Sequence, residues 1–328
     1  MQTRFFLPLA GLLALLPLHA ATAQGTDAAR GYPSRPVRMV IGFMPGGQPD
    51  IAARLIAPRL SDALGQQVVI DNRPGAGGVV GTKIVVDATP DGHTLLTSSS
   101  SIAISPSIYA KLPFDTVKDL AGISNSYTAA YVLAVTPSLG VKNLQEFVAL
   151  AKAKPGQLNY ASAGNGSGMH FAGEIVKQTM NIDIVHVPYK GVPEAITDTI
   201  GGRVQFTMAP LGATVSLIRD GRLRPLAVTT PKRIPVHPDL PTVAELGYPG
   251  FRWDSWAGFF APAKTPRAVV NKLNREIVRV LSEPEIQSRM GAIGMEAAPS
   301  TPEQLDKFLA DQIVLVSQLA KKAGIVAR

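Results

Sequence analysis

The sequence predicts an α/β protein of two domains, and three observations support this fold class. The chain has 328 residues, and at ~100–200 residues per domain this length suggests about two domains. Short apolar segments alternate with segments of helical periodicity, the order expected of parallel strands joined by helices. The alternation begins near residue 37 and starts again near residue 130. Each half is therefore expected to form its own α/β domain, with a cleft between them.

The first half opens with an apolar strand at 37–43, followed by the turn Pro45-Gly46-Gly47. Asp50 precedes apolar residues at helical spacing, and Gly65 ends that helix. The remaining elements expected in this half are a strand at 68–70, a Gly-rich loop at 72–78, a helix running to about 88 and a strand at 94–97.

The second half repeats the plan without an obvious sequence repeat. The expected strands lie at 131–135, 158–160, 184–187, 204–208 and 226–229, and the expected helices at 144–152, 170–180, 193–200 and 214–220. The segment 251–262 then leads to two amphipathic helices, at about 266–281 and 302–324.

The N-terminal residues 1–23 have the pattern of a secretory signal peptide. Arg4 precedes an apolar run at 5–18, and Ala21-Thr22-Ala23 is an A-x-A site that predicts cleavage after Ala23. The run is too short for a membrane anchor, because a span needs about 20 apolar residues. We therefore expect an exported, periplasmic protein.

Composition excludes several classes of function. The chain is 46% hydrophobic and 17% charged, which suits a folded chain with real cores. It has no Cys, which excludes disulfides, thiolate metal sites and a cysteine nucleophile. The net charge is +8, but the cations are scattered rather than gathered in a stripe. With export, this makes a basic solvated surface the favoured interpretation, and we expect no nucleic-acid partner.

Two loops between strand and helix are candidates for anion binding. The loops 44–50 and 162–168 are rich in Gly, and each precedes a helix whose first N–H groups and positive dipole end favour an anion. The alternative for the first loop is an ordinary βα turn with Asp50 as an N-terminal cap, and for the second it is a plain flexible loop. The second loop lacks the Lys-Ser/Thr pair of a P-loop and does not match G-x-G-x-x-G. The hydroxyls of Ser98 and Ser99 follow the strand at 94–97 and should reach the same cleft, although a low-complexity loop is the alternative.

Enzymatic function is not favoured. The sequence has no G-x-S-x-G elbow, no H-E-x-x-H and no other metal-ligand spacing of its His residues. A hydrolase using Ser162 or Ser167 with His170 is the remote alternative. We therefore expect no catalytic residue, no metal and no cofactor.

Several motifs together resemble the Bug-type substrate-binding proteins of the tripartite tricarboxylate transporter family. The resemblance covers the expected mature chain, and its most specific motifs are Asn72-Arg73-Pro74-Gly75-Ala76-Gly77-Gly78 and Val187-Pro188-Tyr189-Lys190-Gly191. It implies a two-domain periplasmic-binding-protein fold of type II-like architecture, with one domain at 24–128 plus 255–328 and the other at 129–254. It also implies a monomer that closes on a small carboxylate, such as a di- or tricarboxylate or an aromatic acid. The partner would be the membrane permease of a tripartite transporter, or a signalling membrane protein if the receptor is a sensor.

The resemblance also implies a set of ligand-binding residues. The first loop would supply Phe43, Pro45, Gly46, Gly47, Gln48 and Asp50. The second region would supply Ser162, Gly166, Ser167 and His170, with Tyr189 and Lys190 nearby.

The sequence departs from the family at three places. His93 stands where an aromatic residue is common, and we expect it to be a structural position rather than a ligand contact. Gln48 stands where the family usually has Ser or Thr, which should reshape the pocket. Met208-Ala209-Pro210 stands where an Asp is common, which argues against an amino-acid ligand.

Overall fold

The structure is a computed structural model that describes residues 29–322, 325 and 327. The predicted signal peptide and its cleavage site lie outside these residues. Within the described part of the chain, no helix has both the length and the apolar character needed to cross a bilayer.

The first lobe begins with three parallel strands connected through helices. Met39 of the central strand lies opposite Ile70 on one side and Leu95 on the other. Gly65, with φ 68°, ends the first helix in the left-handed conformation that favours glycine. The elements are β1 (Val37–Ile41), α1 (Gln48–Leu64), β2 (Val68–Asn72), η2 (Ala76–Gly78), α2 (Val79–Val86), β3 (Thr94–Ser99) and α3 (Ser101–Ile108).

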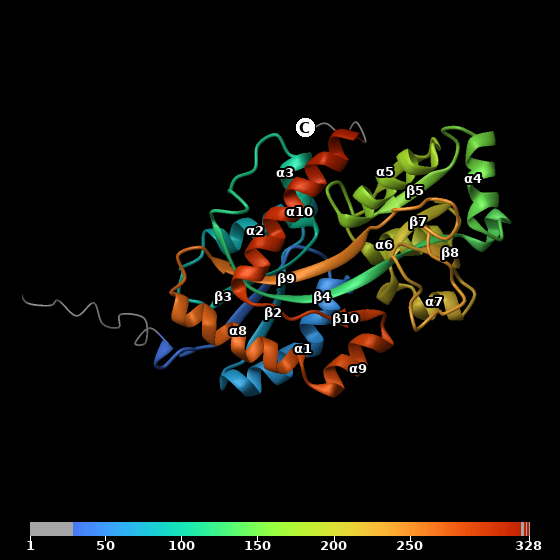
Figure 1. The fold of residues 1–328 in the computed structure, drawn as a ribbon. Coiled ribbons are helices and arrows are strands. Elements are labelled where there is room, and N and C mark those ends of the chain that lie inside the picture. The colour runs from blue at the N-terminus through green and yellow to red at the C-terminus, as the bar shows by residue number, and fades with distance from the viewer. Residues whose placement is uncertain (1–28, 323–324, 326, 328) are drawn as a thin grey trace, which may run out of the picture.

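The 16-residue strand β4 (Leu120–Val135) runs from the first lobe into the second. Its residues from Leu120 to Ala130 pair with β9 (Asp254–Pro262), and those from Tyr131 to Val135 pair with β7 (Phe206–Pro210). Figure 1 shows β4 and β9 passing between the two lobes. These crossing strands make the structure a two-lobed α/β fold with one connected sheet. Its strand order is β2-β1-β3-β9-β4-β7-β5-β6, where β5 is Asn159–Ser162 and β6 is Val185–Pro188.

The second lobe again places parallel strands beside helices. Ala161 lies opposite Val187 on one side and Thr207 on the other. The elements are η3 (Pro137–Leu139), α4 (Leu144–Ala153), β5 (Asn159–Ser162), α5 (Gly168–Met180), β6 (Val185–Pro188), α6 (Val192–Ile200), β7, η4 (Leu211–Ala213), α7 (Val215–Arg219) and β8 (Arg224–Val228).

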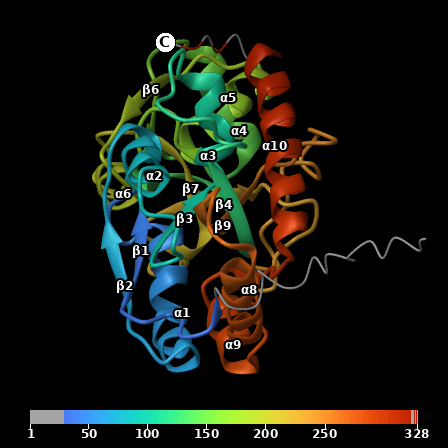
Figure 2. The same cartoon turned by 90° about the vertical axis from the view of Figure 1, so that its left-hand side faces the viewer.

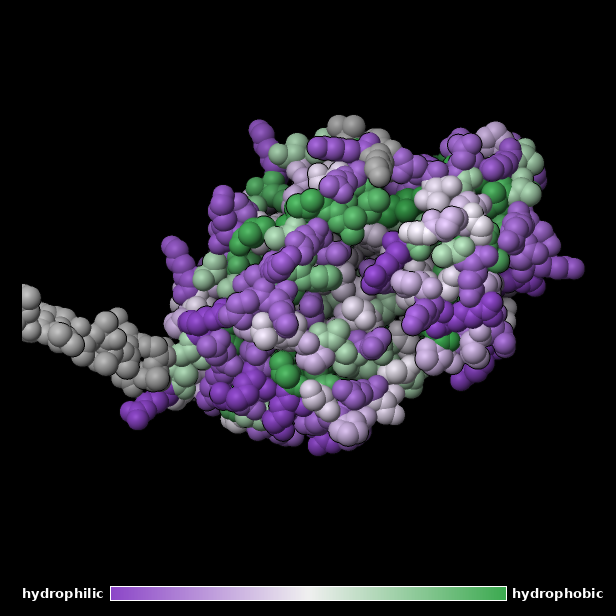
Figure 3. Space-filling view, in the orientation of Figure 1, coloured by the Kyte–Doolittle hydropathy of each residue, from purple (hydrophilic) through white to green (hydrophobic). Residues whose placement is uncertain are grey.

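After β9 the chain returns to the first lobe. It forms α8 (Arg267–Leu281), α9 (Pro284–Ala292), β10 (Met295–Ala297) and α10 (Pro302–Lys322). Figure 2 shows α1, α8 and α9 at one end of the molecule and α4 and α5 at the other, with α10 along one side. Figure 3 shows hydrophilic residues over much of one face and a band of hydrophobic residues across its upper part. Val314 and Leu315 of α10 are exposed.

The order of the predicted elements is confirmed, with four local differences. The strand expected at 131–135 is only the end of β4, because its earlier part is interrupted by polar residues such as Ser124 and Ser126, which are fully buried. The helix α3 was not predicted, since its segment is rich in Ser and contains Pro106. The short elements α9, with 9 residues, and β10, with 3 residues, were not predicted either. Segments of this length show little hydrophobic periodicity.

Candidate ligand-binding site

The carboxyl ends of the parallel strands in both lobes meet at one cleft. In the first lobe β1 leads through the loop 42–47 to α1, and in the second β5 leads through the loop 163–167 to α5. The N-termini of two helices, 17 and 13 residues long, therefore border the same cleft. Ligands of open α/β sheets bind at such strand ends, and helix N-termini favour anions.

Gly47 is the N-cap residue of α1 and leaves that helix end without a side-chain cap. Its φ of −76° is ordinary, and a Cβ at this position would lie no closer than 3.8 Å to other atoms. The absence of a side chain is therefore not demanded by the backbone. It leaves the N–H groups of Gln48 and Asp50 without a side-chain cap, while Pro49 between them has no N–H.

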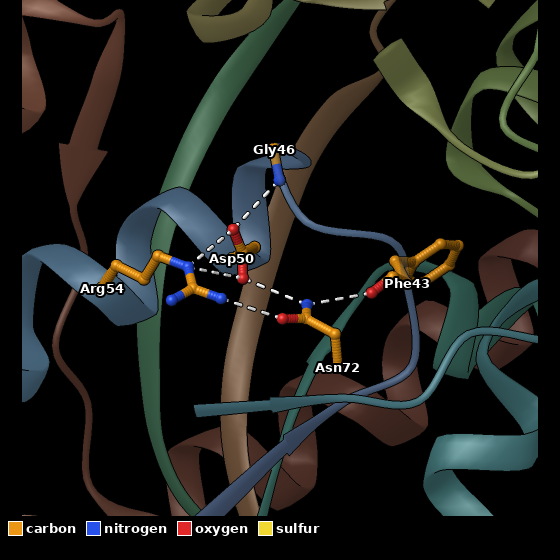
Figure 4. A network of polar contacts seen from close by, with 5 residues as sticks. All are labelled: Phe43, Gly46, Asp50, Arg54 and Asn72. Atoms are coloured by element: carbon orange, nitrogen blue, oxygen red, sulfur yellow. Dashed lines mark hydrogen bonds and ion pairs between the residues drawn. The ribbon is translucent and has the colours of Figure 1, made fainter. Parts of the chain in front are cut away.

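The carboxylate of Asp50 holds the first loop in shape (Figure 4). It accepts hydrogen bonds from the Gly46 N–H, the Asn72 side-chain amide and Arg54, each at 3.0 Å. The same Asn72 amide donates to the Phe43 carbonyl at 3.0 Å. Burial of the Asp50 carboxyl would raise its pKa, but these hydrogen bonds, with Arg54 contributing most, hold the pKa below its usual value. Asp50 therefore supports the loop rather than facing the cleft.

The second loop is held by Ser162 and Ser167. Ser162 is fully buried, and its Oγ accepts from the Gly164 N–H at 3.1 Å and contacts His186 Nε2 at 2.6 Å. Ser167 caps α5, since its Oγ accepts from the His170 N–H at 3.2 Å.

The His186 ring is stacked between two others, with centroids 4.8 Å from Tyr160 and 4.2 Å from His170. Burial is the main cause that lowers the pKa of His186 to about 3, so the ring is neutral at physiological pH. The hydrolase alternative is not supported by this arrangement, because buried Ser162 contacts His186 and Ser167 serves as a helix cap.

An inner pocket of about 40 Å³ lies where the two loops meet. No charged side chain lines it, and its polar side chains are Gln48, Ser99, Tyr131, Ser167 and Ser255. Burial raises the pKa of Tyr131 to about 12, so its phenol remains a hydrogen-bond donor at neutral pH. An anion in this pocket would be held by neutral donors and helix ends.

An outer cavity of about 440 Å³ shares Phe43, Met44 and Ala163 with the inner pocket. Its lining adds Tyr109, Tyr189 and Lys190. Together the two spaces offer a polar, uncharged end and a wider part with aromatic walls and one cation.

Contacts between the lobes surround both spaces. Tyr109 Oη donates to the Asn165 carbonyl at 3.4 Å, and a Cβ on Gly77 would lie 2.6 Å from the same carbonyl oxygen. Met44 of the first lobe lies against Gly191 of the second, where a Cβ would be 3.1 Å from the Met44 Cβ. The lobes thus touch at the rim of the cleft, as in a closed form.

A third cavity, of about 790 Å³, lies away from the two helix N-termini. It is bordered by the loop 230–236, by the end of α9 and by β10. It contains none of the residues predicted for the site, and Arg252 and Asp254 on its wall form an ion pair at 2.7 Å.

The structure separates the predicted site residues into three groups. Those that line the inner pocket are Phe43, Gly47, Gln48, Ser99 and Ser167. Those that line the outer cavity are Phe43, Tyr189 and Lys190. Those that line neither are Pro45, Gly46, Asp50, Ser98, Ser162, Gly166 and His170. Ser98 differs from Ser99 because successive side chains of a strand point to opposite faces.

Sequence reasoning missed Tyr131 and Ser255, which line the inner pocket from the crossing strands β4 and β9. They are 124 positions apart (255 minus 131) in the chain, and neither lies in a Gly-rich loop. Only the pairing of β4 with β9 could have placed them at the cleft.

Comparison with known proteins agrees with this geometry. The family model "tripartite tricarboxylate transporter family receptor" matches residues 52–325. The protein BugT of Bordetella pertussis is 36% identical over 317 residues, covering 95% of this chain and 97% of BugT.

Two solved structures show ligands of relatives. The structure of the R. palustris protein Rpa4515 with adipate has 34% identity and a TM-score of 0.88, covering 90% of this chain and 100% of the other. MatC from Rhodopseudomonas palustris with bound malate has 30% identity and a TM-score of 0.81, covering 88% of this chain and 99% of MatC. The periplasmic-binding-protein fold predicted from the sequence is confirmed.

Proposed function

Because the chain belongs to the tripartite tricarboxylate transporter receptor family, we propose that it captures a small carboxylate in the periplasm and delivers it to a membrane permease. The observation that carries the proposal is the meeting of two helix N-termini at a pocket without charged side chains. Neutral N–H and O–H donors fixed in advance replace the water around a carboxylate, and each charge-assisted bond contributes roughly 1.5–3 kcal/mol.

The wider outer cavity accommodates the rest of the ligand. Phe43, Tyr109 and Tyr189 offer apolar and aromatic surface, and Lys190 offers a positive charge for a second acidic group. Adipate and malate, the ligands of the two solved relatives, are both dicarboxylates. A dicarboxylate with one end in the inner pocket therefore fits both spaces.

Binding is coupled to closure of the lobes. We take 24–128 plus 255–328 as one domain and 129–254 as the other, since β4 changes partners between Ala130 and Tyr131 and β9 begins at Asp254. A ligand that contacts both loops favours the closed form through its additional contacts. The mature receptor is proposed to begin at Gln24 and to act as a monomer, which N-terminal sequencing and light scattering of the exported protein test.

The proposal is tested by a thermal-shift screen of the mature protein with small carboxylates and their amides. A ligand at about 100 times its dissociation constant should add about 2.7 kcal/mol to the free energy of unfolding. A shift with an acid and none with its diamide is the expected result. A screen in which no carboxylate shifts the melting temperature would contradict the proposal.

A variant pair locates the site. Gly47→Val places a side chain over the open end of α1 and should abolish carboxylate binding without unfolding the protein. Gly201→Val is the matched control, because Gly201 also has an ordinary φ of −72° and lines neither of the two cleft spaces. Normal binding by Gly47→Val would remove the first loop from the site. Delivery to the permease is tested separately, by uptake of the identified acid in cells with and without the receptor.

A further inference from the structure

Gln48 is a buried side chain whose polar atoms have no partner within the protein. It is the first residue of α1 and is 2% exposed. Its amide nitrogen Nε2 and its oxygen Oε1 are both buried without a hydrogen bond among the residues that the structure describes. Buried amide groups are normally satisfied, and leaving one unsatisfied is unfavourable.

The location of this amide points to a ligand. Gln48 lines the inner pocket together with Ser99 and Ser167, whose hydroxyls already have protein partners. The Ser99 hydroxyl lies 3.1 Å from that of Ser101, and the Ser167 hydroxyl accepts from a backbone N–H. Gln48 differs from both, since it presents a donor and an acceptor side by side with neither in use. Turning the amide over would exchange the two atoms and leave both without a partner.

We propose that the receptor selects 2-hydroxycarboxylates and that Gln48 is the residue that makes this selection. The ligand hydroxyl donates to Oε1, and the adjacent carboxylate accepts from Nε2. A plain carboxylate satisfies only Nε2 and leaves the buried Oε1 unpaired. A site built to hydrogen-bond a substrate hydroxyl disfavours the analogue without it for this reason.

The same pocket disfavours 2-amino acids. An ammonium group could donate to Oε1, but burying its charge requires a counter-charge. No Asp or Glu lines the inner pocket, and the carboxylate of Asp50 is already occupied by Gly46, Arg54 and Asn72. The preferred donor beside the carboxylate is therefore a neutral hydroxyl.

This inference rests on the proposed function, and matched ligand pairs test it. Isothermal titration of the mature protein compares malate with succinate, and 2-hydroxyglutarate with glutarate, with aspartate as the amino analogue. We expect at least one hydroxy acid to bind about 10-fold or more tightly than its plain partner, the size of effect that one or two hydrogen bonds provide. We expect aspartate to bind more weakly than malate.

Two variants assign the preference to Gln48. Gln48→Met keeps the length of the side chain and removes both polar atoms, so the hydroxy-to-plain ratio should fall to within about twofold. Gln67→Met is the matched control, because Gln67 is exposed and directly precedes β2, at the end of that strand remote from the cleft. It should keep the wild-type ratio, and thermal unfolding of both variants checks that they fold.

The outcomes separate the two hypotheses. If carboxylates bind but the hydroxy acids have no advantage, or if Gln48→Met keeps the advantage, the selectivity of Gln48 is refuted and carboxylate capture stands. Binding of aspartate as tight as that of malate refutes the preference for a neutral donor. If no carboxylate in the panel binds, the proposed function itself fails.

Discussion

Replacing Gly77 with alanine should weaken ligand binding, because this glycine contacts the opposite lobe. Its added Cβ would lie 2.6 Å from the Asn165 carbonyl oxygen and 3.3 Å from the carbonyl carbon of Gly166. Both neighbours are backbone atoms, so neither can turn aside as a flexible side chain would. The lobes of the variant must therefore stay further apart at this point of the rim.

The size of the effect follows from the two separate costs of the substitution. Overpacking costs about 1–3 kcal/mol, and since it affects only the closed form, it lowers affinity by about 5- to 150-fold. The φ of 63° at Gly77 adds a left-handed strain of roughly 1–2 kcal/mol. This strain is present in the open and closed forms alike, so it lowers the free energy of unfolding but not the affinity.

Two measurements on two variants separate these costs. Isothermal titration with the carboxylate identified in the screen gives the affinity, and urea denaturation gives the stability. Gly140→Ala is the control, because Gly140 has a φ of 82° and no atom within 4 Å of an added Cβ. It should lose stability and keep wild-type affinity, whereas Gly77→Ala loses both. Wild-type affinity in Gly77→Ala would show that ligand binding does not require the contact between Gly77 and Asn165.

Three further predictions concern the two loops. Ser167→Ala removes the cap of α5 and should lower the free energy of unfolding by about 0.5–2 kcal/mol; an unchanged urea midpoint would mean that the bond from the His170 N–H contributes nothing. Gln48→Met removes two unsatisfied buried polar atoms, so the ligand-free protein should gain about 1–3 kcal/mol of stability; a lower melting temperature would contradict this. His186 has a pKa of about 3 when folded, against about 6.5 when unfolded, so the unfolded chain binds the extra proton between these values. The free energy of unfolding should therefore fall as the pH decreases through that window. The difference between the urea midpoints at about pH 7 and pH 4.5 should be smaller in His186→Gln than in the wild type. An equal difference in the variant would mean that His186 gains its proton without destabilising the fold.

The sequence was sufficient to predict the parts of this fold that depend on local pattern. The helix α1 has the predicted apolar spacing and ends at Gly65 as predicted. It begins earlier than the pattern indicated, at Gln48, so Asp50 lies in its first turn rather than before it. The helix predicted at 170–180 is also confirmed as α5, although it begins at Gly168 and Ser167, predicted as a ligand contact, serves as its cap. Glycines and capping residues act within a few positions along the chain, so their structural effect can be read from neighbouring residues.

The unpredicted parts depend on contacts between distant segments. The strand β4 is buried along most of its length because β9 and β7 flank it, and this burial places Ser124 and Ser126 inside without an apolar pattern. Tyr131 reaches the inner pocket from the same strand. Long-range pairing of this kind leaves no periodicity in a single sequence, because strand propensity depends on the neighbours that cover the strand.

Asp50 and Gln48 show how one motif divides into support and recognition. Both were predicted to contact the ligand, and they are two positions apart at the start of α1. A carboxylate facing the pocket would repel an acidic ligand, but Asp50 is turned to its own loop, and Arg54 balances its charge at 3.0 Å. Gln48 has no such partner and lines the pocket. Departures from local rules are expected where function requires them, and here the satisfied carboxylate fixes the loop while the unsatisfied amide remains for the ligand.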